Sequence, residues 1–511
     1  MKKMGFICII AILIAGMYFY PHLTSSTDQS YNDEWRKVYH GKGISILFDI
    51  AGSSEGYLAV GATKETSEEW DGWLLKIDKN GNKLWEKFYG GEEEDLFSRV
   101  LQTDDDGYIL AGYTRQRNNG DFWLLKIDKN GNKLWEKFYG GEEEDLLWDL
   151  IKVDGGYIAV GYKTLHISGE YITKAWLIKM DENGNEVWNK TYGNGETVAQ
   201  AIVETEDGCV VSGIVSENFS YAWLIKIDKE GNEVWNKTYG WGMEYSAYLI
   251  RDGRYFVIGG ETETAMWGDA YLIKIDENGN EIWKRRYGGY DQETIWDISK
   301  DKDGYLLAGF TYTFNMGGSQ AANGWLIKVA KNGEEIWNKS FGESAGSELW
   351  RIKEINGKYL LVGDTSLQTD PLTDVGMIIN CRDYQPPNIK ITRPTKAVYI
   401  FDRKIFPSSV TIILGGITIV ANISNLDAID KVEFYLCGPF HYDNFYEPQA
   451  TIYYPPYMWK WESFAIGAGS RPYIVTAAAY YGNAGAVAVD KIEVYIINPF
   501  PAPASSASLH K

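Results

Sequence analysis

The chain has 511 residues, a formal net charge of −20 and a pI near 4.8. This length allows more than one domain. The acidic balance argues against a nucleic-acid partner, because phosphate binding requires clustered lysine and arginine. Aromatic residues make up 15% of the chain, a share that excludes a largely disordered protein.

The N-terminal segment has the features of an export signal. Lys2 and Lys3 are followed by an apolar run from Gly5 to Tyr20. This pattern fits a signal peptide or a short signal anchor over residues 1–22, because a comfortable transmembrane helix needs about 20 apolar residues. We therefore expect an exported protein, extracellular or displayed at the cell surface. The sequence leaves open whether this segment is cleaved or anchors the chain in a membrane. The polar residues 23–32 are expected to be a linker.

The middle of the chain repeats one unit. The stretch WLLKIDKNGNKLWEKFYGGEEEDL, at Trp73–Leu96, returns unchanged at Trp123–Leu146. In the first copy, Trp73–Asp78 alternates as a buried strand does, Asp78–Asn82 has turn residues, and Leu84–Tyr89 is the return strand. A single hairpin is marginally stable in water, so this unit must pack on other copies.

Two markers count the copies. The return-strand tryptophan recurs every 47 to 54 residues, at Trp35, Trp85, Trp135, Trp188, Trp235, Trp283 and Trp337. A strand with the pattern aromatic-x-x-x-Gly precedes the hairpins at Tyr57–Gly61, Tyr108–Gly112, Tyr157–Gly161, Tyr255–Gly259, Tyr305–Gly309 and Tyr359–Gly363, with Cys209–Gly213 standing in once. Such a period is typical of four-stranded propeller blades, and glycine inside a strand indicates a close backbone approach. Residues 33–384 are thus predicted to form seven blades.

The two ends of the repeat region complement each other. Glu34–Tyr39 looks like a return strand with no blade before it, and Met377–Cys381 looks like a third strand with no return strand after it. We expect the N-terminal strand to complete the last blade and close the ring, because closure removes an open sheet edge.

These repeats resemble a family of secreted archaeal and bacterial β-propellers, grouped with the quinoprotein-like propellers, whose units read roughly DGGYI-AGYT and D-WLIK-D-GN--W-K-YGG. The resemblance covers residues 33–384. It implies an extracellular propeller of seven or eight blades, and it does not supply a ligand.

A second domain follows Pro386-Pro387. Strand-like runs at intervals typical of a β-sandwich occur at Val398–Phe401, Val410–Ile423, Lys431–Leu436, Tyr473–Ala479 and Lys491–Ile497. The stretches Lys431–Tyr435, Pro455–Trp461 and Thr476–Tyr480 resemble bacterial immunoglobulin-like domains of surface proteins. The expected fold class is therefore all-β, with an immunoglobulin-like sandwich over residues 385–499 and a disordered tail over residues 500–511.

The repeated turns imitate a calcium loop. Asp-x-Asn-Gly-Asn begins at Asp78, Asp128, Asp181 and Asp276, with a Glu variant at Asp228. An EF-hand also needs glycine at loop position six and glutamate at position twelve, where the first copy has Lys83 and Tyr89. The pattern therefore favours a hairpin turn, and we predict no metal site.

No other motif carries chemistry. Quinoprotein docking motifs place one more residue between Asp and Gly, and the chain has no vicinal cysteine pair. The five histidines are scattered, which gives no support to a zinc site or a catalytic triad. We therefore predict no catalytic residue and no cofactor. Pairing of Cys381 with Cys437, glycosylation and the oligomeric state are left open.

One rim of the propeller carries the candidate binding residues. In this fold the connections from the fourth strand to the next first strand, and from the second strand to the third, open on the same rim. They contain Trp70, Glu92, Glu93, Asp95, Glu142, Glu143, Asp145, Trp267, Asp291 and Glu293. Loops on a rigid scaffold often bind ligands; the alternative is a solvated acidic rim that keeps the protein soluble.

We therefore expect a non-enzymatic recognition, adhesion or scaffold protein at the cell surface, with an extracellular glycan or a surface protein as partner. Catalytic residues would occupy single positions, whereas an identical repeated segment suits a scaffold. The alternative is a carbohydrate-active enzyme or lectin that acts on extracellular glycans.

Overall fold

The computed structural model describes residues 33–496 apart from 66–68, 117–119, 168, 217–218, 241–247, 264–267, 289–291, 313–321, 342–345, 368–369, 382–388, 401, 415–416, 424–430, 438–448, 454, 462–472 and 481–485. The expected export signal, linker and C-terminal tail lie outside these residues. The described residues form strands and turns only. Within them, no helix has the length and apolar character needed to cross a membrane. The chain divides into two compact units between strands β28 and β29.

The described part of the first unit contains seven four-stranded antiparallel sheets. Six of them are built from consecutive strands: β2 (Ile44–Gly52), β3 (Gly56–Lys64), β4 (Asp71–Asp78), β5 (Lys83–Tyr89); β6 (Asp95–Gln102), β7 (Tyr108–Thr114), β8 (Asp121–Ile127), β9 (Lys133–Tyr139); β10 (Asp145–Val153), β11 (Gly156–Ile167), β12 (Glu170–Met180), β13 (Glu186–Tyr192); β14 (Glu196–Thr205), β15 (Gly208–Ser216), β16 (Ser220–Asp228), β17 (Glu233–Tyr239); β18 (Tyr248–Asp252), β19 (Tyr255–Glu263), β20 (Gly268–Ile275), β21 (Glu281–Tyr287); β22 (Glu293–Lys300), β23 (Gly304–Thr311), β24 (Asn323–Ala330), β25 (Glu335–Phe341).

The remaining sheet joins the two ends of the unit. Its strand order is β1-β28-β27-β26, made of β1 (Asp33–Tyr39), β28 (Asp370–Cys381), β27 (Lys358–Leu367) and β26 (Ser347–Ile355). Strand β1 pairs antiparallel with β28, with Tyr39 opposite Gly376 and Trp35 opposite Asn380. The N-terminal strand therefore completes the sheet formed by the last three strands, as the two orphan strands in the sequence predict.

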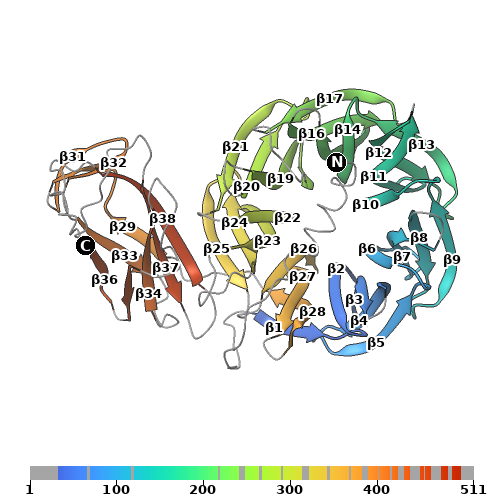
Figure 1. Cartoon of the computed structure of the whole chain (residues 1–511), viewed down its shortest axis with the longest axis horizontal. Helices are drawn as coiled ribbons and strands as arrows, with labels where there is room; N and C mark the ends of the chain where they lie inside the picture. The colour runs from blue at the N-terminus through green and yellow to red at the C-terminus, as the bar shows by residue number, and fades with distance from the viewer. Residues whose placement is uncertain are drawn as a thin grey trace, which may run out of the picture. The chain divides into compact units, whose positions relative to one another are not determined.

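The sheets are arranged in a ring, as in a β-propeller (Figure 1). The first strand of each sheet contacts the first strand of the next, in the order β2, β6, β10, β14, β18, β22, β26 and back to β2. Hydrophobic cores fill the boundaries between adjacent sheets. The core between the last sheet and the first includes Tyr39, Ile378, Leu47 and the fully buried Trp73. A single sheet would leave these side chains in water, so each sheet depends on its neighbours.

A glycine in the second strand faces a β-bulge in the first. The register of β2 against β3 shifts between Leu47 and Asp49, so Phe48 is an extra residue. Opposite it, a Cβ atom on Gly61 would lie only 1.9 Å from the carbonyl oxygen of Ile46. The same close approach occurs at Gly112, Gly161, Gly213, Gly309 and Gly363. The prediction that these glycines mark a close backbone approach is confirmed at these positions.

The outer strand of each sheet clasps the turn of the next sheet. Lys87 Nζ of β5 donates to Asn132 Oδ1 across 3.0 Å, and the hydroxyl of Tyr89 donates to the carbonyl of Gly131. A Cβ atom on Gly131 would meet the ring of Trp85 at 2.8 Å. We call this Trp-Lys-Tyr contact with an Asp-Asn-Gly-Asn turn the inter-sheet clasp. Its tyrosine bond recurs at Tyr192–Gly231, Tyr239–Gly279 and Tyr287–Gly333.

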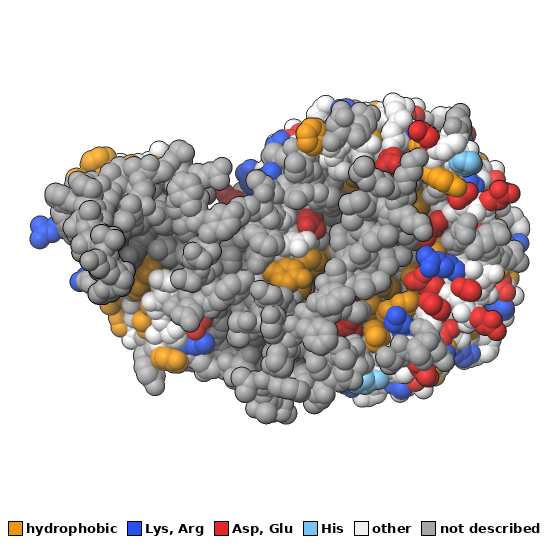
Figure 2. Space-filling view, viewed as in Figure 1, with side chains coloured by type: hydrophobic (Ala, Val, Ile, Leu, Met, Phe, Trp, Pro, Cys, Tyr) orange, Lys and Arg blue, Asp and Glu red, His pale blue; other side chains and the backbone are white. Residues whose placement is uncertain are grey.

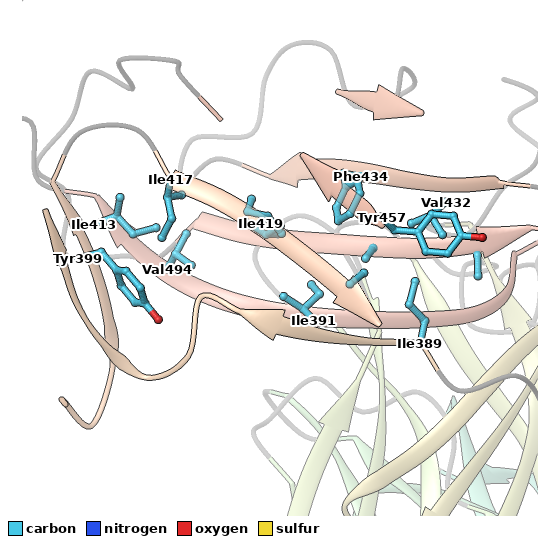
Figure 3. Packing of buried hydrophobic residues seen from close by; sticks show 14 of the residues in the cluster. Ile389, Ile391, Tyr399, Ile413, Ile417, Ile419, Val432, Phe434, Tyr457 and Val494 are labelled. Atoms are coloured by element: carbon cyan, nitrogen blue, oxygen red, sulfur yellow. The ribbon is translucent and has the colours of Figure 1, made fainter. Parts of the chain in front are cut away.

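The second unit contains two sheets that pack face to face. The first consists of β29 (Ile389–Arg393), β33 (Ile417–Ile423) and β36 (Tyr457–Trp461); the second, in strand order, of β31 (Arg403–Pro407), β30 (Ala397–Ile400), β32 (Thr411–Leu414), β38 (Ala486–Ile496), β37 (Tyr473–Tyr480), β34 (Lys431–Cys437) and β35 (Ala450–Ile452). Figure 3 shows Ile391 and Ile419 of one sheet with Phe434 and Val494 of the other in one buried core. A β-sandwich thus follows the propeller unit.

One expectation for this unit needs correction. The run Val410–Ile423 contains two strands, β32, which ends at Leu414, and β33, which begins at Ile417, and they belong to different sheets. The division has a packing reason, because Ile413 of β32 and Ile417 of β33 both point into the core between the two sheets.

Candidate functional site

The predicted rim exists as a structural edge. The connections from the second to the third strand and from the fourth strand to the next first strand are joined by backbone hydrogen bonds. Asp95 N donates to the carbonyl of Trp70 at 2.7 Å, and Ser347 N donates to that of Ala322 at 2.8 Å. We call this edge the loop rim. The opposite edge, which carries the Asp-Asn-Gly-Asn turns, is called the turn rim.

The candidate residues on the loop rim differ in exposure. Glu92, Glu93 and Glu142 are exposed, and Glu143 is half-buried. Trp70 is half-buried, with Lys64 Nζ 4.8 Å from the centre of its ring. Trp267 and Asp291 lie outside the described residues. The solvent-facing part of the predicted site in the described chain is therefore a set of glutamates and one half-buried tryptophan.

The other three candidates, Asp95, Asp145 and Glu293, are fully buried. Each begins a first strand and accepts hydrogen bonds from the loop rim or the neighbouring strand: from Gly91 N at 2.8 Å and Gln116 Nε2 at 2.9 Å for Asp95, from Thr164 N at 3.0 Å for Asp145, and from Thr311 Oγ1 at 2.9 Å for Glu293. Burial raises the pKa of Asp95, and it raises the pKa of Asp145 to about 6. These three carboxyl groups hold the loop rim in place from within.

The residue after each bulge carries a charge in five of the sheets. Arg351 lies 3.5 Å from Asp49 and 3.1 Å from Asp297, and Arg99 lies 2.8 Å from Asp149. Burial opposes ionisation of Asp49, but Lys353, Arg351 and Arg99 outweigh it and hold the pKa of this carboxyl below its usual value. The carboxylates also accept backbone N–H groups of adjacent sheets, for example Val100 N on Asp49 at 2.9 Å. These paired charges connect the innermost strands to one another.

Three of the bulged residues, Phe48, Trp296 and Trp350, form an aromatic group with Tyr248, which pairs with Gly259 at the start of β18. The rings of Trp296 and Trp350 stack with centroids 5.0 Å apart. Phe48 meets Trp350 edge-on at 5.7 Å, and Tyr248 meets Trp296 edge-on at 6.1 Å. All four residues are half-buried. We call Phe48, Tyr248, Trp296 and Trp350 the axial aromatic cluster, because they belong to the innermost strands of the ring (Figure 1).

Three acidic side chains of the last sheet lie beside this cluster. Glu348 on β26 is directly opposite Asp364 on β27, and Trp350 Nε1 donates to Asp364 Oδ1 at 2.5 Å. Asp374 on β28 accepts from Ser366 Oγ at 2.5 Å. All three are half-buried. Burial and the nearby Asp374 raise the pKa of Asp364 to about 8, and burial with both aspartates raises that of Glu348 well above its usual range. In the part of the chain that the structure describes, no group of three His, Cys, Asp or Glu residues has the geometry to hold a metal ion.

A second tryptophan pattern in the sequence, separate from the return-strand tryptophans, marks this cluster. Tryptophan recurs between an aliphatic and a charged residue in LWD at 147–149, IWD at 295–297 and LWR at 349–351. This pattern marks the bulge of a first strand, where the side chain is released from the packed faces of the sheet.

The charge on the surface is mixed. Figure 2 shows acidic side chains scattered over the visible face of the first unit with basic side chains among them, rather than gathered in one patch. Arg115 illustrates the mixing, since it lies 3.0 Å from Glu94 and 3.6 Å from Glu144 on the loop rim. The net charge is therefore partly neutralised locally, and the acidic trio beside the aromatic cluster differs from this pattern.

Comparison with known proteins identifies no family. No protein-family model matches the chain, and no curated protein matches it. Among solved structures, the β-propeller domain of the Trilobed protease from Pyrococcus furiosus is 10% identical and covers 68% of this chain and 97% of its own, with a TM-score of 0.40. Sqt1 from Chaetomium thermophilum is 11% identical, with coverage of 67% and 96% and a TM-score of 0.39. Acylaminoacyl peptidase from Pyrococcus horikoshii is 12% identical, with coverage of 73% and 60% and a TM-score of 0.40. The fold assignment therefore rests on the strand order and ring contacts of this chain.

Proposed function

We propose that the chain is a seven-bladed β-propeller closed by its N-terminal strand and followed by an immunoglobulin-like β-sandwich. We propose further that it is an exported, non-enzymatic recognition or adhesion protein, which binds an extracellular glycan or a surface protein through the loop rim. The seven first strands in mutual contact, the pairing of β1 with β28 and the two-sheet second unit support the architecture. The basic and apolar N-terminal pattern supports export.

The observation that carries the binding proposal is the difference between the two rims. On the turn rim, Asp78 accepts hydrogen bonds from Asn80 N, Asn82 N and Asn82 Nδ2 at 2.8 to 2.9 Å, so its carboxylate is used within the turn. On the loop rim, Glu92 and Glu93 are exposed and Trp70 is half-buried. Rings and carboxylates at the surface offer stacking and hydrogen-bond acceptors to a partner.

The test is a binding titration of the purified chain against glycans and against fractionated cell envelope. A loop-rim variant combines Trp70→Ala, Glu92→Gln and Glu93→Gln. The matched turn-rim variant combines Lys79→Gln and Lys129→Gln. We expect affinity to fall about tenfold or more in the loop-rim variant and to stay unchanged in the turn-rim variant. Loss of binding only in the turn-rim variant would show that the site lies on the turn rim and would contradict the proposal.

A carbohydrate-active enzyme is the second candidate. The observation that favours it is the raised pKa of Asp364, because a carboxyl group that stays protonated at neutral pH can act as a general acid. This candidate predicts release of reducing ends from a polysaccharide, abolished by Asp364→Asn. Binding without any release of reducing ends favours the recognition protein.

A further inference from the structure

We propose that the axial aromatic cluster binds a glycan that carries protonated amino groups, such as an oligosaccharide of glucosamine. This inference rests on the proposed recognition function, but it assigns a second binding site, on the innermost strands rather than on the loop rim. The geometry that supports it is the stack of Trp296 and Trp350, with Phe48 and Tyr248 at the edges and carboxyl groups beside the rings.

The rings provide the apolar part of the site. Trp296, Trp350, Phe48 and Tyr248 lie within 6.1 Å of their neighbours, centroid to centroid, and none is fully buried. Half-buried indole rings in contact with one another present an apolar surface that the C–H face of a sugar can cover. Four such rings on innermost strands of four different sheets come together only in the closed ring.

The carboxyl groups select a cation. Trp350 connects the two parts of the site, since its indole N–H donates to Asp364. Asp364 interacts electrostatically with Glu348 from β26 and with Asp374 from β28, so three acidic groups lie near one another. An ammonium group would balance the negative charge of these carboxyl groups and lie against a tryptophan face. In this arrangement the cation–π attraction adds to the ion pair.

The basic side chains of the surrounding strands are engaged elsewhere. On β26, Arg351 pairs with Asp49 of β2 and Asp297 of β22, and Lys353 lies 2.6 Å from Asp49. Within the described residues, the charged groups that act on Glu348 are Asp364 and Asp374. Trp350 and Ser366 donate hydrogen bonds to Asp364 and Asp374, but buried acidic groups normally also have a cationic partner. A positively charged ligand would supply one.

The proposal predicts a specific pH dependence. Burial and mutual repulsion raise the pKa of Asp364 to about 8, so a neutral solution leaves this group largely protonated. A cation binds the ionised form, whereas the amine of the ligand is a weak base that titrates at about pH 7–8, as α-amino groups do. Affinity should therefore be highest in the pH range where the carboxyl group is partly ionised and the amine is still partly protonated, and it should fall at lower and at higher pH. Binding at neutral pH should release protons, because the cation lowers the pKa of the carboxyl groups.

The experiment titrates the purified chain with two matched oligosaccharides, one of glucosamine and one of N-acetylglucosamine, which differ in charge at the amino group. Isothermal calorimetry in two buffers of different ionisation enthalpy measures affinity and proton release. We expect the glucosamine oligomer to bind about tenfold or more tightly than the acetylated one, with proton release at pH 7. Equal binding of the two oligomers, or no binding of either, would overturn the proposal, as would a lysine-containing peptide that binds while the glucosamine oligomer does not.

Variants locate the site. Trp296→Ala and Asp364→Asn should each weaken binding of the glucosamine oligomer about tenfold. Trp148→Ala removes a half-buried tryptophan at the corresponding bulge of β10 and serves as the matched aromatic control. Lys129→Gln removes an exposed charge on the turn rim and serves as the charge control. Both controls should keep full affinity. Because Asp364→Asn keeps the size of the side chain, it remains informative if Trp296→Ala misfolds. Binding that is lost in the loop-rim variant but intact in Trp296→Ala and Asp364→Asn would preserve the proposed function and refute this inference.

Discussion

The hydroxyl group of Tyr39 donates a hydrogen bond to the carbonyl oxygen of Gly81 across 2.8 Å, and the side chain of Tyr39 is buried. Tyr39 belongs to β1 in the last sheet, whereas Gly81 lies in the turn of the first sheet. Lys37 and Trp35 reach the same turn, at Asn82 Oδ1 across 2.7 Å and at the carbonyl of Lys79 across 3.1 Å. The ring is therefore closed by the same inter-sheet clasp that joins sheets inside it.

Tyr39→Phe should destabilise the chain. The change leaves the buried carbonyl of Gly81 without this donor, which costs about 1–3 kcal/mol. Denaturant unfolding followed by tryptophan fluorescence measures the loss. Tyr171→Phe is the control, because Tyr171 is 60% exposed. An equal effect of both substitutions would show that the closing hydrogen bond contributes nothing.

Removal of β1 should have a larger effect than removal of the segment before it. A chain that starts at residue 42 lacks the outer strand of the last sheet and exposes the edge of β28, which is a template for pairing with another chain. We expect aggregation or a lower melting temperature, measured by light scattering and differential scanning calorimetry. A chain that starts at residue 33 keeps β1 and is the matched control. The idea fails if the shorter chain is as stable and monomeric as the control.

The Asp-Asn-Gly-Asn turns should be indifferent to chelators. The carboxylate of Asp128 accepts hydrogen bonds from Asn130 N, Asn132 N and Asn132 Nδ2 at 2.8 to 2.9 Å. The turn thus satisfies its own carboxylate without an ion. Treatment with EDTA should leave the melting temperature unchanged. A drop of several degrees that calcium restores would contradict this prediction.

Two glycines separate backbone strain from contact with the clasp. Gly131 and Gly155 have φ angles of +73° and +74°, so alanine is disfavoured equally by the backbone at both. A Cβ atom at Gly131 would lie 2.8 Å from the ring of Trp85, whereas at Gly155 it would meet nothing within 4 Å. Gly131→Ala should therefore lower the free energy of unfolding more than Gly155→Ala does. Equal losses in denaturant unfolding would mean that the clasp yields to the added methyl group.

The repeat made much of this fold predictable, because each strand, turn and glycine appears several times with the same spacing. The pairing of β1 with β28 followed from two incomplete ends. The side of the ring on which the loops gather also followed from strand order alone. Local patterns of this kind report local structure, and the sequence repeats them often enough to fix the register.

The composition of the site was less predictable. Asp95 and Asp145 belong to acidic stretches that look solvated, yet both are fully buried because each begins a first strand and bonds to the adjoining loop. Trp296 and Trp350 lie 54 residues apart in the sequence and stack only because two sheets are neighbours in the ring. The tryptophan between an aliphatic and a charged residue marks the bulge of a repeat, but it does not show which bulges bring their rings into contact.

The acidic trio should make stability fall as the pH rises. The pKa of Asp364 is raised to about 8 in the folded chain by burial and by Asp374, whereas an unfolded aspartate titrates near pH 4, about its ordinary value. The folded state therefore binds the proton more tightly. Ionisation of Asp364 therefore lowers the free energy of unfolding. This loss begins at about pH 4, grows as the pH rises and is complete above about pH 8. Asp364→Asn removes this penalty, so it should raise the melting temperature at pH 9 and have little effect at pH 4.

Asp105 provides a control of the opposite sign. Lys126 Nζ donates to Asp105 Oδ1 across 2.6 Å, and this hydrogen bond holds the pKa of Asp105 at about 2. The contribution of this hydrogen bond to the free energy of unfolding is fully present above the unfolded pKa of about 4, and it disappears as the pH falls through about 2. Asp105→Asn should therefore lower the melting temperature modestly at pH 7, since the carboxylate is largely exposed and screened by solvent. Melting curves of both variants between pH 4 and pH 9 check the pair. If Asp364→Asn lowers the melting temperature at pH 9 as Asp105→Asn does, the carboxyl group of Asp364 is stabilised in its ionised form and the acidic trio is not under the repulsion inferred here.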